Sequence, residues 1–169
     1  MTGIKLGLLA AAGSAALLLA AFVFQALGYA PCAMCIWQRY PHAVAFGAGV
    51  ILAIGLAPLA FLTIGAVSAA TTATIGLYHT GVERDWWQGP TSCTGSGLDL
   101  SNLTVSELLP SASSSPSNLV LCDEVAWEFL ALSMASWNAV WSAVLAGVWV
   151  LAIVRTISNR QTLRSATST

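Results

Sequence analysis

The sequence predicts an all-α membrane protein, a bundle of four transmembrane helices with one long loop between the third and the fourth. Three observations predict this fold. Of the 169 residues, 57% are hydrophobic and only 8% are charged, whereas soluble domains average about 25% charged residues. Uncharged runs recur at lengths that cross a bilayer as helices. All seven acidic residues lie in one segment, between the third and fourth runs.

The uncharged runs locate the expected spans. Leu6–Leu27 has 22 residues, and Leu59–Tyr78 and Ala135–Val154 have 20 each, enough for a helix to cross ~30 Å of hydrocarbon. Ala43–Ala57 has only 15, so we expect the preceding residues, from 36 onward, to complete a fourth span at the headgroup level. The first run exceeds the ~7–15 apolar residues of a signal peptide, which predicts that it is retained. We therefore expect one membrane domain over residues 1–169, with spans at about 6–28, 36–56, 59–79 and 135–155 and a loop at about 80–134.

The placement of charge predicts the orientation. Basic residues flank the first and last spans on the side where both termini emerge: Lys5, Arg155, Arg160 and Arg164. The positive-inside rule places that side in the cytoplasm. The loop and the cysteines then face outward, which in a bacterium is the oxidising periplasm, where disulfides persist. The net charge of -1 and the lack of a basic cluster argue against nucleic acid as a partner.

Part of the loop is predicted to fold against the membrane. After residue 123, Val125, Phe129 and Leu132 fall on one side of a helical pattern, and the neighbouring apolar residues widen that side. This pattern predicts a short amphipathic helix that lies on the bilayer surface.

A closely spaced pair of cysteines, Cys32 and Cys35, follows the first span. The pair shares one helical face with Arg39 and His42, because the four residues are spaced by three, four and three. With Pro31 as the first helical residue, the helix dipole and Arg39 favour a thiolate at Cys35, and Cys32 is expected to be the more exposed sulfur. The residue after the second cysteine is not histidine, which argues against c-type haem. The wide spacing of the other two cysteines argues against zinc, so we expect no metal.

Other candidate site residues keep more than one interpretation. Cys93 and Cys122 are predicted to form a disulfide that closes the loop. Taken alone, this disulfide would be as consistent with a structural role as with a redox role. Because a dithiol lies at the same membrane surface, a role in a redox relay is favoured. Arg39 either extends to lipid phosphates or contacts a thiolate or a ligand carbonyl. His42 is either a satisfied buried histidine or a ligand contact. His79, at the outer end of the third span, either donates to a ligand or faces water.

Four segments resemble the disulfide bond formation protein B (DsbB) family, and the likeness runs from the first span to the fourth. They are Pro31–Arg39 (Pro-Cys-Ala-Met-Cys-Ile-Trp-Gln-Arg), Tyr78–Glu83 (Tyr-His-Thr-Gly-Val-Glu), Gly89–Cys93 (Gly-Pro-Thr-Ser-Cys) and Leu121–Glu124 (Leu-Cys-Asp-Glu). The resemblance implies a four-helix bundle in the bacterial inner membrane that reoxidises a periplasmic thioredoxin-fold oxidase of the DsbA type. It also implies that ubiquinone or menaquinone receives the electrons.

The same resemblance implies roles for the cysteines. Cys93 corresponds to the sulfur that the partner attacks, and Cys122 corresponds to its disulfide mate. Cys32 and Cys35 correspond to the pair that reoxidises them. Together with the helical-face pattern, the resemblance gives the expected quinone contacts: Cys35, Arg39, His42 and His79.

Two other functions stay open at this point. A thiol oxidoreductase like vitamin K epoxide reductase also combines a helical bundle with a CxxC pair, but there the pair lies near the end of a late helix and the loop cysteines precede it. A non-catalytic membrane scaffold or transporter subunit would need neither Cys32 nor Cys35, and no acidic residue within a span supports transport. We therefore expect a quinone-linked thiol oxidase whose partners are a DsbA-like protein, the membrane quinone pool and the lipid bilayer.

Overall fold

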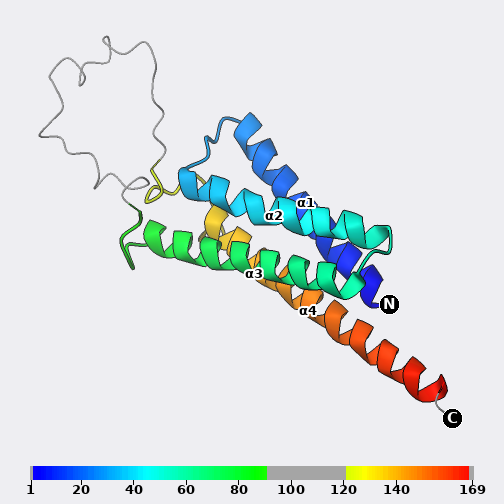
Figure 1. The fold of residues 1–169 in the computed structure, drawn as a ribbon. Helices are drawn as coiled ribbons and strands as arrows, with labels where there is room; N and C mark the ends of the chain where they lie inside the picture. The colour runs from blue at the N-terminus through cyan, green and yellow to red at the C-terminus, as the bar shows by residue number, and fades with distance from the viewer. Residues whose placement is uncertain (1, 91–120, 168–169) are drawn as a thin grey trace, which may run out of the picture.

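The computed structural model describes residues 2–90 and 121–167, and helices dominate the regular structure in them. The elements are α1 (Gly3–Ala26), α2 (Ala33–Ala53), α3 (Pro58–Glu83), β1 (Glu128–Phe129), β2 (Leu132–Ser133) and α4 (Met134–Thr167) (Figure 1). Among these residues, α1, α3 and α4 are long and apolar enough to cross a membrane. This architecture is consistent with an all-α membrane protein. Because Gln38, Arg39 and His42 lower the hydropathy of α2, the count of four spans stays a prediction.

Local interactions set the helix ends. The side chain of Thr2 caps α1, and α1 ends just before Gly28, whose φ of 100° lies in the left-handed region that favours glycine. Cys32 is the N-cap of α2, since its sulfur accepts the backbone N–H of Cys35 at 3.2 Å. The prediction that Pro31 begins this helix is therefore wrong by two positions, although both sulfurs still lie at its start. Pro41 lies inside α2, which continues through it as one helix.

The segment predicted as an amphipathic helix forms a hairpin instead, so that prediction is wrong. Strands β1 and β2 pair antiparallel, and Leu130 and Ala131 between them have φ values of 53° and 60°. A tight hairpin turn of type I′ requires two consecutive residues with positive φ, as these two residues have. Hydrogen bonds attach the hairpin to the bundle. Arg84 donates to the carbonyl of Ala131 at 2.9 Å, Trp137 donates to that of Phe129 at 3.1 Å, and Ser133 of β2 donates to the carboxylate of Glu83. These bonds to other elements outweigh the local helical pattern.

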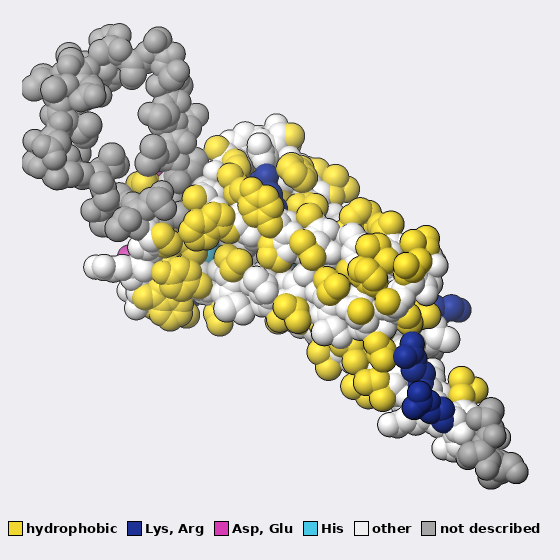
Figure 2. Space-filling model, in the orientation of Figure 1, with side chains coloured by type: hydrophobic (Ala, Val, Ile, Leu, Met, Phe, Trp, Pro, Cys, Tyr) yellow, Lys and Arg dark blue, Asp and Glu magenta, His cyan; other side chains and the backbone are white. Residues whose placement is uncertain are grey.

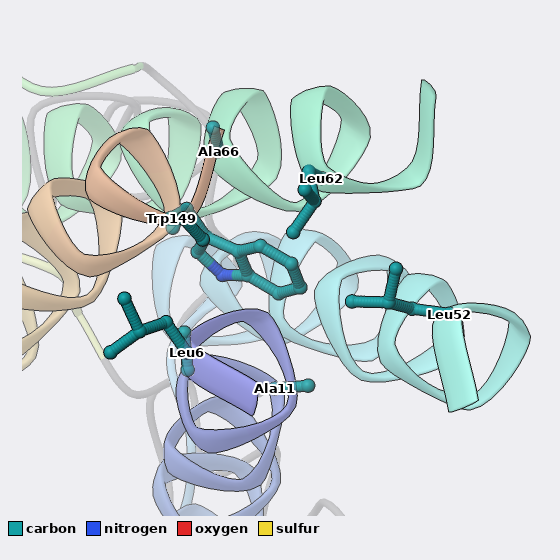
Figure 3. Packing of buried hydrophobic residues seen from close by; sticks show 9 residues of the cluster. Leu6, Ala11, Leu52, Leu62, Ala66 and Trp149 are labelled. Carbon is teal, nitrogen blue, oxygen red and sulfur yellow. The ribbon is translucent and has the colours of Figure 1, made fainter. Parts of the chain in front are cut away.

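Trp149 of α4 is the largest fully buried side chain of the described residues. Figure 3 shows its indole surrounded by apolar side chains from the other three helices: Leu6, Ala11, Leu52, Leu62 and Ala66. A Cβ added at Gly65 of α3 would lie 2.5 Å from a carbon of this ring. The close approach of α3 to α4 therefore depends on glycine at this position, as is common between membrane helices.

The arrangement of the helices places the site at one end of the bundle. The most extensive helix–helix contact joins α3 and α4, and α1 contacts α2 and α4 far more than α3. Both chain termini lie at one end, and the end of α1, the start of α2, the end of α3 and the start of α4 lie at the other (Figure 1). Hydrophobic side chains cover the length of the bundle in Figure 2, and basic side chains gather at the end with the termini.

Candidate active site

The cysteine pair at the start of α2 is reduced and closely associated. Cys32 and Cys35 are free cysteines, and the Cys32 thiol donates to the sulfur of Cys35 at 2.8 Å. Cys32 is only 4% exposed, because it packs in a cluster with Val82 of α3 and with Cys122, whereas Cys35 is half-buried. The prediction that Cys32 is the more exposed sulfur is therefore wrong.

The same hydrogen bond distributes charge between the two sulfurs, both of which precede the predicted second span. The bond donated by Cys32 lowers the pKa of the Cys35 thiol below its ordinary value, and Arg39 makes a smaller contribution in the same direction. That bond, together with burial, raises the pKa of the Cys32 thiol. The negative charge of the reduced pair is thus favoured on Cys35, chiefly because of its neighbour Cys32.

A third cysteine lies against this pair. Cys122 is fully buried and disulfide-bonded, and its sulfur, the sulfur of Cys32 and a ring nitrogen of His79 all lie within 4.8 Å of one another. Cys93 lies outside the described residues, so its pairing with Cys122 stays a prediction. The three donor atoms form a soft ligand set. Because the disulfide occupies one of them, the set falls short of the four ligands typical of structural zinc and suits thiol–disulfide exchange better.

His79 is buried beside Cys32, with 3% of its surface exposed. Its Nδ1 lies 3.0 Å from the side-chain nitrogen of Gln38, and its Nε2 lies 3.6 Å from the sulfur of Cys32 and 3.8 Å from a carboxylate oxygen of Glu83. Of the two interpretations made from the sequence, the one in which His79 faces water is therefore wrong.

His42 belongs to a hydrogen-bonded chain that crosses from α2 to α4. Its Nε2 lies 2.9 Å from Oδ1 of Asn138, and Nδ2 of Asn138 donates to Oε1 of Gln38 at 2.6 Å. His42 is 3% exposed, and its Nδ1 has no partner among the described residues. One ring nitrogen is thus satisfied within the protein and the other is not.

Arg39 extends from α2 to α1. It donates to Oε1 of Gln25 at 2.6 Å and to the carbonyl of Ala21 at 3.4 Å, and its guanidinium carbon lies 4.9 Å from the ring centre of Phe22. Its buried Nε finds no hydrogen-bond partner within the described part of the chain. Arg39 is therefore fixed against the bundle while one donor remains available.

These residues surround one cavity of about 420 Å³. Residues of all four helices and of the segment before β1 line it, and most of its wall is apolar, including Phe24, Trp127, Trp137 and Trp141. The four residues expected as ligand contacts all line it: Cys35, Arg39, His42 and His79. The residues on the predicted face of α2 and His79 of α3 thus line the same cavity, beside the sulfurs of the cysteine pair.

The comparison with protein families identifies the chain. The family model described as Disulfide bond formation protein DsbB matches residues 5–152. The chain belongs to the DsbB family. The matched range contains α1, α2, α3, most of α4 and every site residue described above, and membership indicates an oxidoreductase of disulfide bond formation in a membrane. Neither the comparison with curated proteins nor that with solved structures gave a match.

Two residues of this DsbB-family site were missed from the sequence. Gln38 lies one turn before His42 on the same face of α2, and this spacing could have indicated it. Asn138 is the one amide side chain in the uncharged run Ala135–Val154 of α4, and a strongly polar residue in a membrane helix is itself a signal for function. Together they join His79 of α3 to His42 of α2.

Proposed function

We propose that this DsbB-family protein reoxidises a periplasmic DsbA-like dithiol oxidase and passes the two electrons to a membrane quinone. The observation that carries the proposal is the position of the Cys32 sulfur, within 4.8 Å of the Cys122 sulfur and 2.8 Å from that of Cys35. Cys35 in turn lines the apolar cavity. The sulfur of Cys32 is therefore close both to the predicted loop disulfide and to Cys35, at the wall of a cavity of suitable size for a quinone ring.

The partner reacts first, at the predicted disulfide of Cys93 and Cys122. A thiolate of the partner attacks Cys93, so that a mixed disulfide forms and Cys122 leaves as a thiolate. The second thiolate of the partner then attacks this mixed disulfide, which completes the disulfide of the partner and releases Cys93. The part played by Cys93 rests on the family resemblance.

The electrons then move to the pair at the start of α2. The Cys122 thiolate attacks Cys32 in the oxidised pair; the Cys32–Cys122 bond forms, the Cys32–Cys35 bond breaks, and the electron pair leaves on Cys35. Arg39 favours the negative charge on Cys35 as it leaves, and the bond from Cys32 that lowers the pKa of Cys35 in the reduced pair can form only once Cys32 is released. The Cys93 thiolate next attacks Cys122 and releases Cys32. The product state has a loop disulfide and two reduced cysteines, and in the described residues Cys122 is disulfide-bonded while Cys32 and Cys35 are free.

The cavity beside Cys35 fits a quinone by size and by chemistry. Ligand pockets of this kind are mostly apolar with a few placed polar groups, and here the aromatic walls suit a flat ring. Arg39 has a buried Nε without a partner in the described residues, so it can donate to a carbonyl oxygen. A bound quinone would supply an acceptor for two electrons and two protons.

The remote wall of the cavity suits the tail of such a molecule. Leu17 and Leu18 lie in the middle of α1, and Trp141 lies two turns into α4 and is half exposed. The apolar lining thus continues along the helices, away from the cysteines, where a prenyl chain could leave the cavity toward lipid.

Turnover of the purified protein in a lipid bilayer tests this function. With a reduced DsbA-like partner and quinone, we expect one quinone to be reduced for each partner dithiol oxidised, followed by quinone absorbance. Cys35→Ser should abolish quinone reduction and still allow the partner to form a mixed disulfide with Cys93. Ser158→Ala, at an exposed position of α4 that does not line the cavity, is the control for the loss of a small polar group. Quinone reduction that persists in Cys35→Ser would exclude the proposed route.

A further inference from the structure

A backbone carbonyl fixes the orientation of the Gln38 amide. Its Nε2 lies 3.2 Å from the carbonyl oxygen of Met34, and a carbonyl oxygen only accepts hydrogen bonds. This atom is therefore the amide nitrogen, and its second hydrogen is available to Nδ1 of His79, 3.0 Å away. On the other side of the amide, Oε1 accepts from Asn138 at 2.6 Å, in agreement with the same orientation.

The orientation of Gln38 in turn fixes the tautomer of His79. Because Nδ1 accepts from Gln38, the proton of the neutral imidazole is on Nε2. Nε2 lies 3.6 Å from the sulfur of Cys32, which is hydrogen-bonding distance for sulfur, and 3.8 Å from Glu83, and the ring also hydrogen-bonds the backbone of Cys122, the residue whose sulfur Cys32 exchanges with. His79 thus presents an N–H donor, not a lone pair, to the reactive sulfur.

We propose that Gln38 is a positioning residue that keeps the proton of His79 on Nε2, so that His79 donates to Cys32 and stabilises its thiolate as Cys32 leaves the disulfide with Cys122. This inference rests on the proposed function, in which that mixed disulfide is an intermediate. The Cys93 thiolate attacks Cys122; the Cys93–Cys122 bond forms, the Cys32–Cys122 bond breaks, and the electron pair goes to the sulfur of Cys32. The exchange balances without another oxidant or reductant.

The burial of Cys32 explains why such a donor is needed. A thiolate at a position that is 4% exposed loses the hydrogen bonds of water, and burying a charge without compensating donors is costly. The structure supplies two N–H groups near this sulfur: the backbone N–H of Cys35 at 3.2 Å and Nε2 of His79. Hydrogen bonds to an ionised acceptor are roughly twice as strong as those between neutral groups. The opposite tautomer of His79 would instead direct a lone pair at the departing charge.

The test has one readout that is independent of turnover. Nitrogen NMR of the full chain in lipid nanodiscs reports which ring nitrogen of His79 carries the proton. We expect the proton on Nε2 in the wild type, and a mixture of tautomers in Gln38→Met, which removes the amide at nearly constant size. Gln161→Met is the matched control, because Gln161 is exposed near the far end of α4.

The second readout is the lifetime of the Cys32–Cys122 disulfide after one turnover with reduced partner, measured without quinone by acid quench and peptide mapping. Loss of a hydrogen bond to a charged group predicts a lifetime about ten- to a hundred-fold longer in His79→Leu. Gln38→Met should lengthen it by a smaller factor. His79→Gln, whose amide N–H can reach toward Cys32, should recover part of the loss.

Three outcomes would overturn the inference: a wild-type proton on Nδ1, a His79→Leu lifetime equal to that of the wild type, or a Gln38→Met protein in which both tautomer and lifetime are unchanged. A wild-type protein that never forms the Cys32–Cys122 disulfide would overturn the relay itself, and this inference with it. That last failure is distinguishable, because the NMR measurement would still find the proton on Nε2.

Discussion

Replacement of Arg39 by methionine should weaken quinone use and leave exchange among the cysteines intact. The side chain lines the cavity beside Cys35, and its buried Nε has no partner in the described residues. Its bonds to Gln25 and Ala21 fix the guanidinium against α1, so it is already oriented before a ligand binds. Methionine retains much of the apolar stem and removes only the donors and the charge.

The expected magnitude follows from the loss of one hydrogen bond from a charged donor. Such a bond contributes ~1.5–3 kcal/mol, which corresponds to a roughly ten- to hundred-fold loss of apparent quinone affinity. The bond to Gln25 is exposed, and its loss should cost the fold little. The assay is the rate of quinone reduction against quinone concentration, with thiol–disulfide exchange between the partner and the cysteines followed separately.

Two further variants sharpen this test. Arg39→Lys should recover only part of the affinity, because a compact ammonium does not reproduce the planar fork of donors. Arg160→Met is the control, because Arg160 is exposed near the far end of α4 and does not line the cavity. An unchanged dependence on quinone concentration in Arg39→Met would refute the proposed contact and leave Arg39 as a structural or lipid-facing residue.

Three further predictions concern packing, charge and topology. Gly65→Ala should destabilise the bundle by ~1–3 kcal/mol, because its methyl group would meet the ring of Trp149, while Gly47→Ala, where a methyl group meets nothing within 4 Å, should not; equal unfolding midpoints in detergent would contradict this. Alkylation of Cys35 in the reduced protein should slow as the pH falls through its lowered pKa, since only the thiolate reacts; a midpoint at or above the ordinary value of a thiol would count against it. A membrane-impermeant thiol reagent should label Cys93 in reduced intact cells, and labelling only after lysis would reverse the orientation.

The helices could be predicted from the sequence because they depend on composition. Three uncharged runs, and a fourth completed by the residues before it, predicted the four helices close to their observed places. Most ends differ by a few residues, for example where Cys32 caps α2, but α4 continues to Thr167, well past the expected end of its span. The hairpin before α4 could not be predicted in this way. Its turn places Leu130 and Ala131 in a conformation that apolar spacing does not reveal, and the bonds from Arg84 and Trp137 come from other elements.

In the site, too, features that depend on spacing within one helix could be predicted, and features that depend on contacts between elements could not. Helical spacing placed Cys35, Arg39 and His42 on one face, and all three line the cavity. The burial of Cys32 was not predicted, because the groups that cover it come from α3 and from the segment around Cys122. The hydrogen-bonded chain through the cavity wall was missed for the same reason: each of its bonds joins residues far apart in the sequence, and a polar residue acquires its role from a partner on another helix.

The relay from the loop to α2 is tested most directly by asking which sulfur Cys122 reaches. In Cys35→Ser/Cys93→Ser only Cys32 and Cys122 remain, and in Cys32→Ser/Cys93→Ser only Cys35 and Cys122 remain. With the Cys122 sulfur within 4.8 Å of Cys32, we expect mild oxidation to form a disulfide readily in the first protein and at most slowly in the second, as measured by peptide mapping under non-reducing conditions. Equal cross-linking in both proteins, or cross-linking only through Cys35, would contradict a relay that passes through Cys32.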